Sequence, residues 1–502
     1  MLALSMDGTY ETRSRWVEKI AFFGLFIAVL LIAYLIVIWR SALVLSEPIE
    51  LNCASLSVCI PAGNGWRSEK QWKYQQNTLA LDSFFNPSPG SITTIVSCRY
   101  FLAAVETAPE VLFDKKASAI SGSKITKIGR IETGEPADSS SAKDPQNRSF
   151  PAIDWAHIEG PKASFDTFFG TVRLPNNRRL DIEVHQDAGD MNLAEGIFKS
   201  VTESLKFTDN QLLEAGSKII AEIKSKGLDS FSASAGKKRG DQESFFLIKD
   251  ARERTIGFIM EAIGPHKTGE FAAWSFYYIR GRYELEQVTL FQSRNNLEEF
   301  VWKSETSGQG RRRGAEIVLG KDGIMTVREF DLRAEENNYQ ISPAAIPDVM
   351  DKFLFSQMLD SGQKEIFVDM IEADGKITPV FVSRIEVGPS TASPAAPARV
   401  EKRGGGKNRS SGADVAREEA AYVFRMELLD GSGFSQQVYL DNQRQISKIL
   451  LQQESTYTLE RTGAENILRE FPGQGYILQR KDKIPEPNQL QESDEQQPAA
   501  SY

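Results

Sequence analysis

The sequence predicts an α+β protein in three parts: a single N-terminal transmembrane helix, an α+β domain, and a mainly antiparallel β domain with the pattern of a half-barrel. Residues 20–39 form one uncharged apolar run. After it, short stretches rich in β-branched and aromatic residues alternate with Asp-Gly and Pro-Asn turn signals. Such stretches are typical of antiparallel strands, and few segments show the apolar spacing of helices.

The apolar run at residues 20–39 contains no charged residue and no proline. At about 1.5 Å per residue, a helix of this length spans about 30 Å, the thickness of the hydrocarbon core of a bilayer. A cleaved signal peptide has a shorter apolar core that ends in a small-residue cleavage site, and this run has neither property. We therefore expect an uncleaved signal anchor.

Basic residues beside the anchor predict its orientation. Arg13, Arg15 and Lys19 precede the run, whereas Arg40 is followed by no Lys or Arg until Arg67. Because cytoplasmic flanks carry the excess of Lys and Arg, residues 1–19 should form a cytoplasmic stub. The bulk of the chain is then extracytoplasmic, at a plasma or inner membrane, or periplasmic in a cell envelope with two membranes.

Composition argues against nucleic-acid binding. The chain carries a formal net charge of −9, with 41% hydrophobic and 25% charged residues, which is ordinary for soluble domains. A nucleic-acid binder would present a basic face. The one basic cluster, Arg311-Arg312-Arg313, lies between glycines. We interpret it as the solvated tip of a hairpin rather than as an anion site.

Three cysteines, Cys53, Cys59 and Cys98, are too few for a fold built on disulfides. Cys53 and Cys59 could pair only if the chain turns between them, because a straight strand would hold their Cα atoms about 20 Å apart. A Cys59–Cys98 bridge between neighbouring strands and free buried thiols are the two alternatives.

The first folded unit is predicted at residues 47–207. Residues 51–60 and 91–102 are expected to be strands, and residues 109–120 a helix with Pro109 in its first turn. A polar loop at residues 134–149 follows. The remaining predicted elements are strands at 153–160, 164–174 and 179–185 and an amphipathic helix at 192–205.

Three short motifs in residues 50–207 resemble the PsbP-like fold of bacterial envelope proteins. They are the segment IPAGNGW at residues 60–66, the hairpin LPNNR at residues 174–178, and the closing helix GIFKSVTESLKF at residues 196–207. The resemblance implies a binding or assembly role and carries over no functional residue.

The second unit is predicted from residues 243–387 together with 419–478, after a helix and linker at 208–242. Asp-Gly pairs at 322–323, 374–375 and 430–431 predict type I′ hairpins. The other predicted elements are a helix at 342–360 with Pro343 or Pro347 in its first turn, and disordered segments at 388–418 and 481–502. Alternatively, residues 419–478 form a third domain.

This unit resembles the half-barrel sheets of LolA-type lipoprotein carriers. The features that carry the resemblance are the long meander over 243–478, the helix opened by SPAAIP at 342–347, and the hairpin MELLDGSGFSQQVYLD at 426–441. It implies an apolar cavity for a lipid. Aromatic residues on the meander could form one wall of that cavity or simply pack on the sheet; they are Trp274, Phe276, Tyr277, Tyr278 and Tyr283.

Catalytic patterns are missing from the sequence. A zinc or general-base site from His157, His185 and either Asp154 or Asp181 is conceivable, but no H-x-x-x-H spacing supports it. No G-x-S-x-G elbow, P-loop or dinucleotide fingerprint occurs. We therefore expect no catalytic residue, metal or cofactor.

The leading hypothesis is a non-enzymatic, membrane-anchored binding or scaffolding component of the cell envelope. Its expected partners are the membrane and another envelope protein or a lipid, with no nucleic acid. The alternative is a tethered lipid or lipoprotein carrier that uses a half-barrel cavity. A metal-dependent enzyme is the third hypothesis.

Overall fold

The computed structural model describes sixteen stretches of the chain. They are residues 21–32, 43–63, 65–75, 77–85, 93–132, 151–187, 191–208, 211–233, 242–265, 270–281, 285–308, 311–330, 335–385, 421–429, 432–453 and 455–474. The predicted cytoplasmic stub, the loop at 134–149, the two predicted disordered segments, Tyr283 and His266 lie outside these residues.

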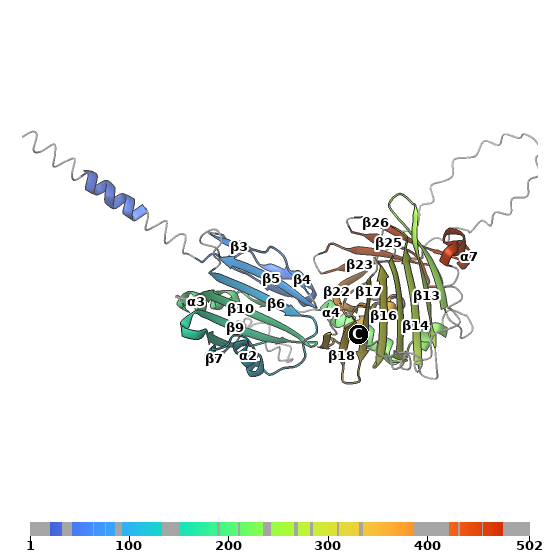
Figure 1. Ribbon diagram of the computed structural model, residues 1–502, viewed down its shortest axis with the longest axis horizontal. Helices are drawn as coiled ribbons and strands as arrows, with labels where there is room; N and C mark the ends of the chain where they lie inside the picture. Colours follow the sequence, from blue (N-terminus) through green and yellow to red (C-terminus); the bar gives the residue numbers. More distant parts are fainter. Residues whose placement is uncertain are drawn as a thin grey trace, which may run out of the picture.

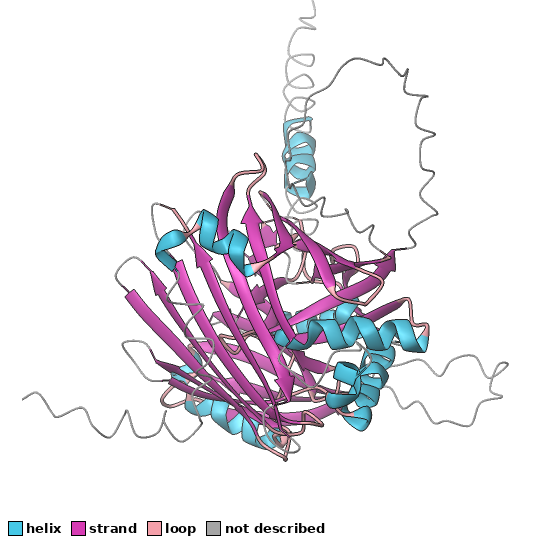
Figure 2. Cartoon of the chain, turned by 90° about the vertical axis from the view of Figure 1, so that its right-hand side faces the viewer, coloured by secondary structure: helices cyan, strands magenta, loops and turns pink. Residues whose placement is uncertain are grey.

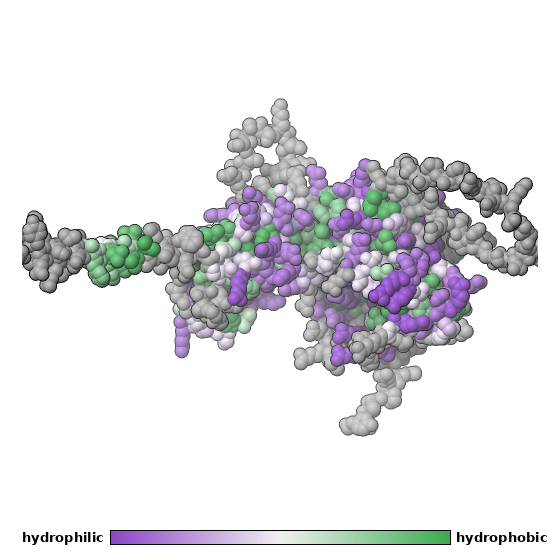
Figure 3. Space-filling view, turned by 90° about the horizontal axis from the view of Figure 1, so that it is seen from above, coloured by the Kyte–Doolittle hydropathy of each residue, from purple (hydrophilic) through white to green (hydrophobic). Residues whose placement is uncertain are grey.

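The described part of the predicted anchor is one helix at residues 21–32. Its apolar side chains are exposed, and Figure 3 shows the apolar surface that they form. Among the residues that the structure describes, no helix combines the length and the hydropathy needed to cross a membrane. The rest of the run at 20–39 lies outside those residues, so the membrane span stays a prediction.

The first unit is built on an eight-stranded antiparallel sheet with the order β3-β5-β6-β10-β9-β8-β7, in which β4 also pairs with β5 (Figure 1). Its strands and the short 3₁₀ turn η2 are β3 (Trp66–Ser68), β4 (Lys73–Gln75), β5 (Thr78–Phe85), β6 (Thr94–Phe101), β7 (Lys124–Ile131), β8 (Ile153–Glu159), η2 (Pro161–Ala163), β9 (Phe165–Leu174) and β10 (Arg178–Asp187). The strands expected at 91–102, 153–160, 164–174 and 179–185 are thus confirmed.

Two helices cover opposite faces of this sheet. In α3 (Met191–Glu203), Phe198 packs against Trp155 and Phe168. In α2 (Pro109–Ser118), Phe113 meets Phe169, the next residue along β9, edge to face. Since neighbouring residues of a strand point to opposite faces, the sheet lies between the two helices. Both helices are where the sequence predicts them, and α2 has its proline in the first turn.

The strand predicted at residues 51–60 is wrong. The chain forms β1 (Ile49–Leu51), a 3₁₀ turn η1 (Asn52–Ala54) and β2 (Leu56–Val58), and β1 pairs antiparallel with β2. Ser55 reverses the chain because it adopts a left-handed conformation, with φ 46°. With β11 (Lys206–Phe207), these strands make a small third sheet.

The second unit is a single fifteen-stranded sheet with the order β19-β18-β17-β16-β15-β14-β13-β12-β26-β25-β24-β23-β22-β21-β20. Every neighbouring pair is antiparallel except β20 with β21. Its strands are β12 (Gln242–Lys249), β13 (Thr255–Pro265), β14 (Glu270–Ile279), β15 (Leu285–Arg294), β16 (Phe300–Gly308), β17 (Arg311–Leu319), β18 (Ile324–Phe330), β19 (Glu335–Gln340), β20 (Ala345–Pro347), β21 (Glu365–Ile371), β22 (Ile377–Ile385), β23 (Tyr422–Leu428), β24 (Ser435–Leu440), β25 (Ile446–Gln452) and β26 (Thr456–Thr462). The closing strands complete the sheet, because β26 pairs with β12.

The two edges of this sheet are consecutive in sequence, and this forces the sheet to curl. If flat, fifteen strands spaced about 4.8 Å apart would place the outer two about 67 Å apart. Only residues 341–344 separate the end of β19 from the start of β20, a span of at most about 19 Å. The sheet therefore wraps around an interior, as Figure 2 shows, without its edge strands pairing. We call it the incomplete barrel.

Helix α6 (Asp351–Ser361) lies inside the incomplete barrel and fills one end of it. Phe353 meets Phe271 of β14 edge to face, and Phe355 stacks on Phe424 of β23, on the opposite side of the barrel. The predicted helix at 342–360 therefore starts too early. Its first part is β20 and the 3₁₀ turn η3 (Asp348–Met350), because β20 pairs with β21 instead of coiling.

Helix α4 (Gln211–Lys226) covers the part of the β21 edge that β20 leaves open. A Cβ at Gly216 would lie 1.9 Å from the carbonyl oxygen of Phe367 in β21, so only glycine permits this approach. The helix expected within residues 208–242 is confirmed. A short helix α5 (Asp229–Ala233) follows it within the predicted linker.

The Asp-Gly hairpins at 322–323 and 374–375 form as predicted, but the predicted turn type is wrong; the pair at 430–431 lies outside the described residues. Gly320 N–H donates to Ile324 O and Gly323 N–H donates to Gly320 O, both at 3.0 Å. Within the pair only Gly323 has a positive φ, 73°. This is a type I turn closed by a glycine bulge rather than a type I′ turn, and the hairpin at Gly375 repeats it.

A buried ion pair joins the two units. Arg178 of β10 donates from Nη2 to both carboxylate oxygens of Asp369 in β21, at 2.8 and 2.7 Å. Its Nη1 donates to the backbone oxygen of Cys53 and to the hydroxyl of Tyr100. One continuous hydrophobic core runs through both units.

Candidate ligand cavity of the incomplete barrel

The interior of the incomplete barrel contains a cavity of about 1020 Å³ above the first turn of α6. Side chains from β12 to β19, from β21, and from β24 to β26 line it. Pockets for small ligands have volumes of about 300–1000 Å³, so this cavity is large enough for an extended molecule.

One wall of the cavity is apolar. It belongs to β12 and β13 and to the segment from the start of β25 to β26, and the strand pairs β12–β13 and β12–β26 hold it together. We call this set the apolar wall: Phe246, Ile259, Ile446, Ile449, Leu451 and Leu459. Ile446, Ile449 and Leu451 pack against the buried cluster around Leu459, yet they are only half-buried because part of their surface borders the cavity.

Beside the apolar wall, the cavity lining is polar and is ordered by strand register. Glu261 of β13 pairs across the sheet with Ser275, Ser275 with Thr289, and Thr289 with Ser304. Ser275 Oγ lies 2.7 Å from Thr289 Oγ1, and Ser304 Oγ donates to the backbone oxygen of Ala373. A row of hydroxyls therefore leads from Glu261 around the barrel, on the cavity side of β14, β15 and β16.

Three carboxyl groups meet where the barrel wall reaches the first turn of α6. They are Glu261 on β13, Asp348 on η3 and Asp351 at the start of α6, beside the ammonium group of Lys352. All four side chains are half-buried, because they are enclosed by protein yet border the cavity. We call the three carboxyl groups the acid cluster.

Burial disfavours the charged form of each member of the acid cluster. It raises the pKa of Asp351 to about 7, with help from Glu261 and against the opposing charge of Lys352. Burial also raises the pKa of Asp348 well above its ordinary value, and the carboxylates of Asp351, Glu372 and Glu261 add to this. The pKa of Glu261 is raised by burial and lowered in part by Lys352.

The charged side chains that line the cavity are mostly acidic. The six acids are Glu261, Glu329, Asp348, Asp351, Glu372 and Asp374, and the three bases are Arg313, Lys352 and Lys376. With all groups ionised, the lining therefore has a formal charge of −3. Lys376 is already paired with Asp374 at 2.6 Å, so it does not offset the acid cluster.

Arg313, which the sequence predicts at a solvated hairpin tip, belongs to β17, and its side chain lines the cavity. Arg312 is its neighbour on the strand and forms an exposed ion pair with Glu305. Alternation along β17 separates the two, and the sequence shows no sign of which arginine faces inward.

Three of the aromatic residues proposed as a cavity wall, Trp274, Phe276 and Tyr278, lie on the outer face of the barrel. Phe276 and Tyr278 pack with Phe258 beneath α7 (Ala464–Glu470) and the 3₁₀ turn η4 (Pro472–Gln474), on the side far from the first unit (Figure 1). Trp274 packs against the same cluster. The residues of β14 that line the cavity are instead Ser275 and Tyr277. The alternation of side chains along β14 predicts two faces. Which face is enclosed depends on α6 lying inside the barrel and on α7 covering its outside.

The two described histidines cannot form a joint metal or general-base site. His157 stacks on Phe168, which pairs with Val184, so His157 shares the sheet face of Val184. His185 is the next residue after Val184 and points to the other face, where its ring meets Thr167 Oγ1. Across the described residues, no group of His, Cys, Asp and Glu is arranged to hold a metal ion.

His157 has a structural environment. Its Nε2 lies 2.8 Å from Asp166 Oδ1, and its Nδ1 lies 2.5 Å from Thr126 Oγ1. Asp154 and Asp181 are on the His185 face, where Asp181 accepts a hydrogen bond from Thr171 and pairs with Arg179. The residues of the conceivable zinc site are therefore divided between two faces.

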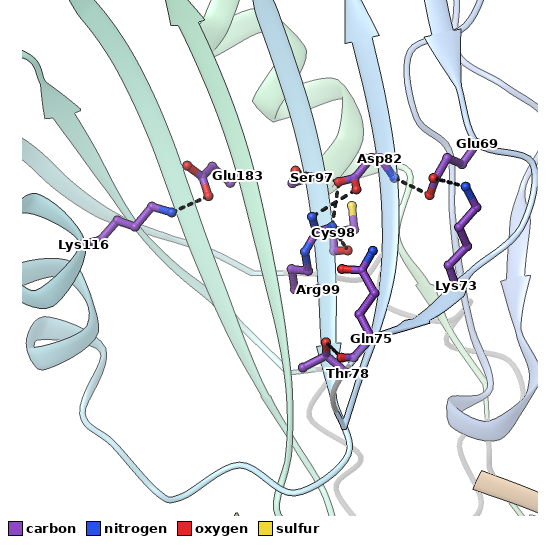
Figure 4. A network of polar contacts seen from close by, with 10 residues as sticks. All are labelled: Glu69, Lys73, Gln75, Thr78, Asp82, Ser97, Cys98, Arg99, Lys116 and Glu183. Carbon is purple, nitrogen blue, oxygen red and sulfur yellow. Dashed lines mark hydrogen bonds and ion pairs between the residues drawn. The ribbon is translucent and has the colours of Figure 1, made fainter. Parts of the chain in front are cut away.

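The α2 side of the first sheet carries a network of charges that satisfy one another (Figure 4). Arg99 donates to both oxygens of Asp82, and Ser97 donates to Asp82 as well. Lys116 reaches from α2 to Glu183 at 2.6 Å. Because these groups are paired with one another, the network stabilises the sheet and does not indicate a ligand site.

No disulfide joins Cys53, Cys59 or Cys98 in the structure. Burial raises the pKa of Cys53 and of Cys98 to about 12, so neither is a thiolate at neutral pH. Of the three alternatives from the sequence, the structure shows thiols without a disulfide, with Cys53 and Cys98 buried and Cys59 half-buried.

A scan of known protein families finds none that matches this chain, and no curated protein matches it either. Among solved structures, it is similar to the crystal structure of a β-barrel-like protein of the domain of unknown function DUF1849 from Brucella abortus. The two share 8% sequence identity with a TM-score of 0.32, and the match covers 44% of this chain and 95% of that chain.

Proposed function

We propose that this chain is a non-enzymatic binding protein of the cell envelope that holds an elongated amphipathic molecule inside its incomplete barrel. The observation that carries the proposal is the cavity of about 1020 Å³, with its apolar wall on one side and hydroxyl groups and charges on the other. Under this proposal, residues 20–39 anchor the chain in the plasma or inner membrane and the barrel faces outward.

The apolar wall supports an alkyl chain as one part of the ligand. Burying each methylene group contributes about 0.8 kcal/mol. Ile446, Ile449 and Leu451 keep part of their surface open to the cavity, so a ligand can still bury it. A purely apolar ligand would leave the acid cluster without a partner, and for this reason we propose an amphipathic one.

The resemblances found in the sequence fit this proposal. The LolA-type likeness of residues 243–478 favours a tethered lipid or lipoprotein carrier over a purely scaffolding component. The PsbP-like likeness of residues 50–207 gives the first unit a binding or assembly role. In this arrangement the first unit contributes to the cavity directly, because Asn77 of its β4–β5 turn lines it and accepts a hydrogen bond from Ile377 N–H.

Native mass spectrometry of the full chain, extracted gently from its membrane, tests the proposal. We expect a co-purified amphiphile with the wild type and its loss in Ile449→Asp, which places a charge on the apolar wall. Leu468→Asp is the matched control, because Leu468 is 39% exposed on α7 outside the barrel. Circular dichroism must show that both variants are folded. A wild type that carries no ligand after gentle extraction, and binds none on addition, would falsify the proposal.

A further inference from the structure

We infer that the cavity selects an amphiphile whose polar end is a cation, such as an amine or a quaternary ammonium group, and that the acid cluster binds this end. The inference deepens the proposed function and rests on it. Three steps support it: the charge of the lining, the position of the acid cluster, and a buried donor that has no partner among the described residues.

The charge balance disfavours an anionic head. Around the first turn of α6, three carboxyl groups face the single ammonium of Lys352. Glu372 adds a fourth carboxylate that acts on Asp348. Like charges in a cavity of low dielectric repel strongly, so an anionic head would add to the repulsion and a cation would relieve it.

The raised pKa values of the acid cluster mean that protonation, and not an ion pair within the protein, reduces its charge. Among the described residues, none forms an ion pair within 4.0 Å with Glu261, Asp348 or Asp351. Charged groups away from bulk water are ordinarily paired or neutralised. A cation on the ligand would therefore supply the ion pair that the acid cluster lacks within the described part of the protein.

Trp302 provides the second, independent observation. It is 1% exposed and lines the cavity, yet its indole Nε1–H has no hydrogen-bond partner in the part of the chain that the structure describes. On β16 it lies two residues from Ser304, which ends the hydroxyl row that starts at Glu261. A ligand with an acceptor atom on this side of the cavity would satisfy that donor.

The apolar wall begins next to the acid cluster, which suits a single amphiphile. Ile259 lies two residues from Glu261 on the same strand and on the same face, and both line the cavity. Phe246 is the cross-strand partner of Ile259. A ligand with its cation at Glu261 would therefore place its alkyl chain along the apolar wall without a break.

Calorimetric titration with three amphiphiles of equal alkyl length tests the inference. The full chain is kept in a nonionic amphipol, and dodecyltrimethylammonium, dodecyl maltoside and dodecyl sulfate are titrated below their micelle concentrations. We expect the ammonium to bind at least tenfold more tightly than the sulfate, with the maltoside between them. Since this comparison uses the wild type alone, it does not depend on any variant folding.

Two variants then assign the preference to the acid cluster. Glu261→Gln and Asp351→Asn should each weaken ammonium binding about tenfold and leave maltoside binding within twofold. Glu465→Gln on the exposed face of α7 is the matched control and should change neither.

The outcomes separate the two proposals. Equal binding of all three heads, or tighter binding of the sulfate, overturns the cation preference and leaves the proposed function standing. An ammonium preference that survives in both variants overturns the assignment to the acid cluster. If none of the three amphiphiles binds the wild type, the proposed function itself fails.

Discussion

At the scale of single residues, the incomplete barrel holds ionisable groups at positions where burial disfavours their charged forms. Glu261, Asp348 and Asp351 border the cavity with raised pKa values, and burial lowers the pKa of Lys352 beside them. Core positions in a protein selected only for stability would be apolar. We infer that the buried acid cluster lowers the free energy of unfolding of the empty protein, and that ligand binding offsets this loss.

Removing one member of the acid cluster should change how stability depends on pH. The pKa of Asp351 is about 7 in the folded chain and near its ordinary value of 3.8 when unfolded. Between these values the folded state binds more protons, so the free energy of unfolding falls as pH rises from about 4 to 7. We expect Asp351→Asn to be the more stable form at pH 8, by up to about 4 kcal/mol, and to match the wild type near pH 4.

Urea unfolding at pH 4, 6 and 8 measures this difference. The groups that face Asp351 are Glu261, Asp348 and Lys352. They are present in the wild type and in the variant, so the two proteins differ only in the titration of Asp351 and in its effect on these neighbours. Parallel stability curves for the wild type and Asp351→Asn would contradict a raised pKa at this position.

At the scale of elements, the sequence predicts most strands correctly because alternating apolar and polar residues survive in the structure. β6 alternates between buried and half-buried along its whole length, and the predicted hairpins at Gly323 and Gly375 close at their Asp-Gly turns. Errors appear where one residue or one pairing overrides the local pattern. Ser55 breaks a predicted strand by adopting a left-handed conformation, and β20 replaces the first turns of a predicted helix because β21 offers it an edge.

Helix α4 provides a test of packing at this scale. Replacing a helical glycine by alanine ordinarily stabilises a protein by about 1 kcal/mol. At Gly216 the new Cβ would lie 1.9 Å from Phe367 O, a backbone atom that cannot move aside cheaply. We therefore expect Gly216→Ala to destabilise the protein by about 2 kcal/mol or more, by analogy with overpacked cores.

Gly196→Ala in α3 is the matched control, because a Cβ added at Gly196 would meet nothing within 4 Å among the described residues. It should leave the protein unchanged or stabilise it by up to about 1 kcal/mol. Melting temperatures by circular dichroism compare the two, and shifts of the same sign would show that α4 does not pack against β21 as described.

At the scale of the whole molecule, the two units behave as one body. The hydrophobic core is continuous from the first sheet to α6, and the Arg178–Asp369 pair closes the junction with side chains that are at most 2% exposed. The residues that meet there are 191 positions apart in the chain. We therefore expect one cooperative unfolding transition rather than two.

Breaking the junction tests this coupling. In Asp369→Ala the buried guanidinium of Arg178 loses its counter-ion, which should cost about 3–5 kcal/mol. Guanidinium unfolding followed by circular dichroism and by tryptophan fluorescence should show this loss, with transitions in both units shifted together.

Asp360→Ala is the control. Asp360 and its partner Arg444 are each 38% exposed, so that pair should contribute less than about 1 kcal/mol. A shift confined to one of two separate transitions would contradict a single body.

The sequence by itself determined the local features of this protein: the apolar run at 20–39, most strands and helices, and the lack of catalytic motifs. These follow from side-chain alternation and turn chemistry within a few residues.

The tertiary structure decided the cavity and its lining. A strand pattern shows that Ser275 and Tyr277 share one face and that Phe276 and Tyr278 share the other, but it does not say which face is enclosed. That depends on α6 entering the barrel and α7 covering its outside, and on β19 and β20 being drawn together by the four residues between them. The acid cluster arises in the same way, because Glu261 and Asp351 are 90 positions apart and meet only when the sheet curls around the helix.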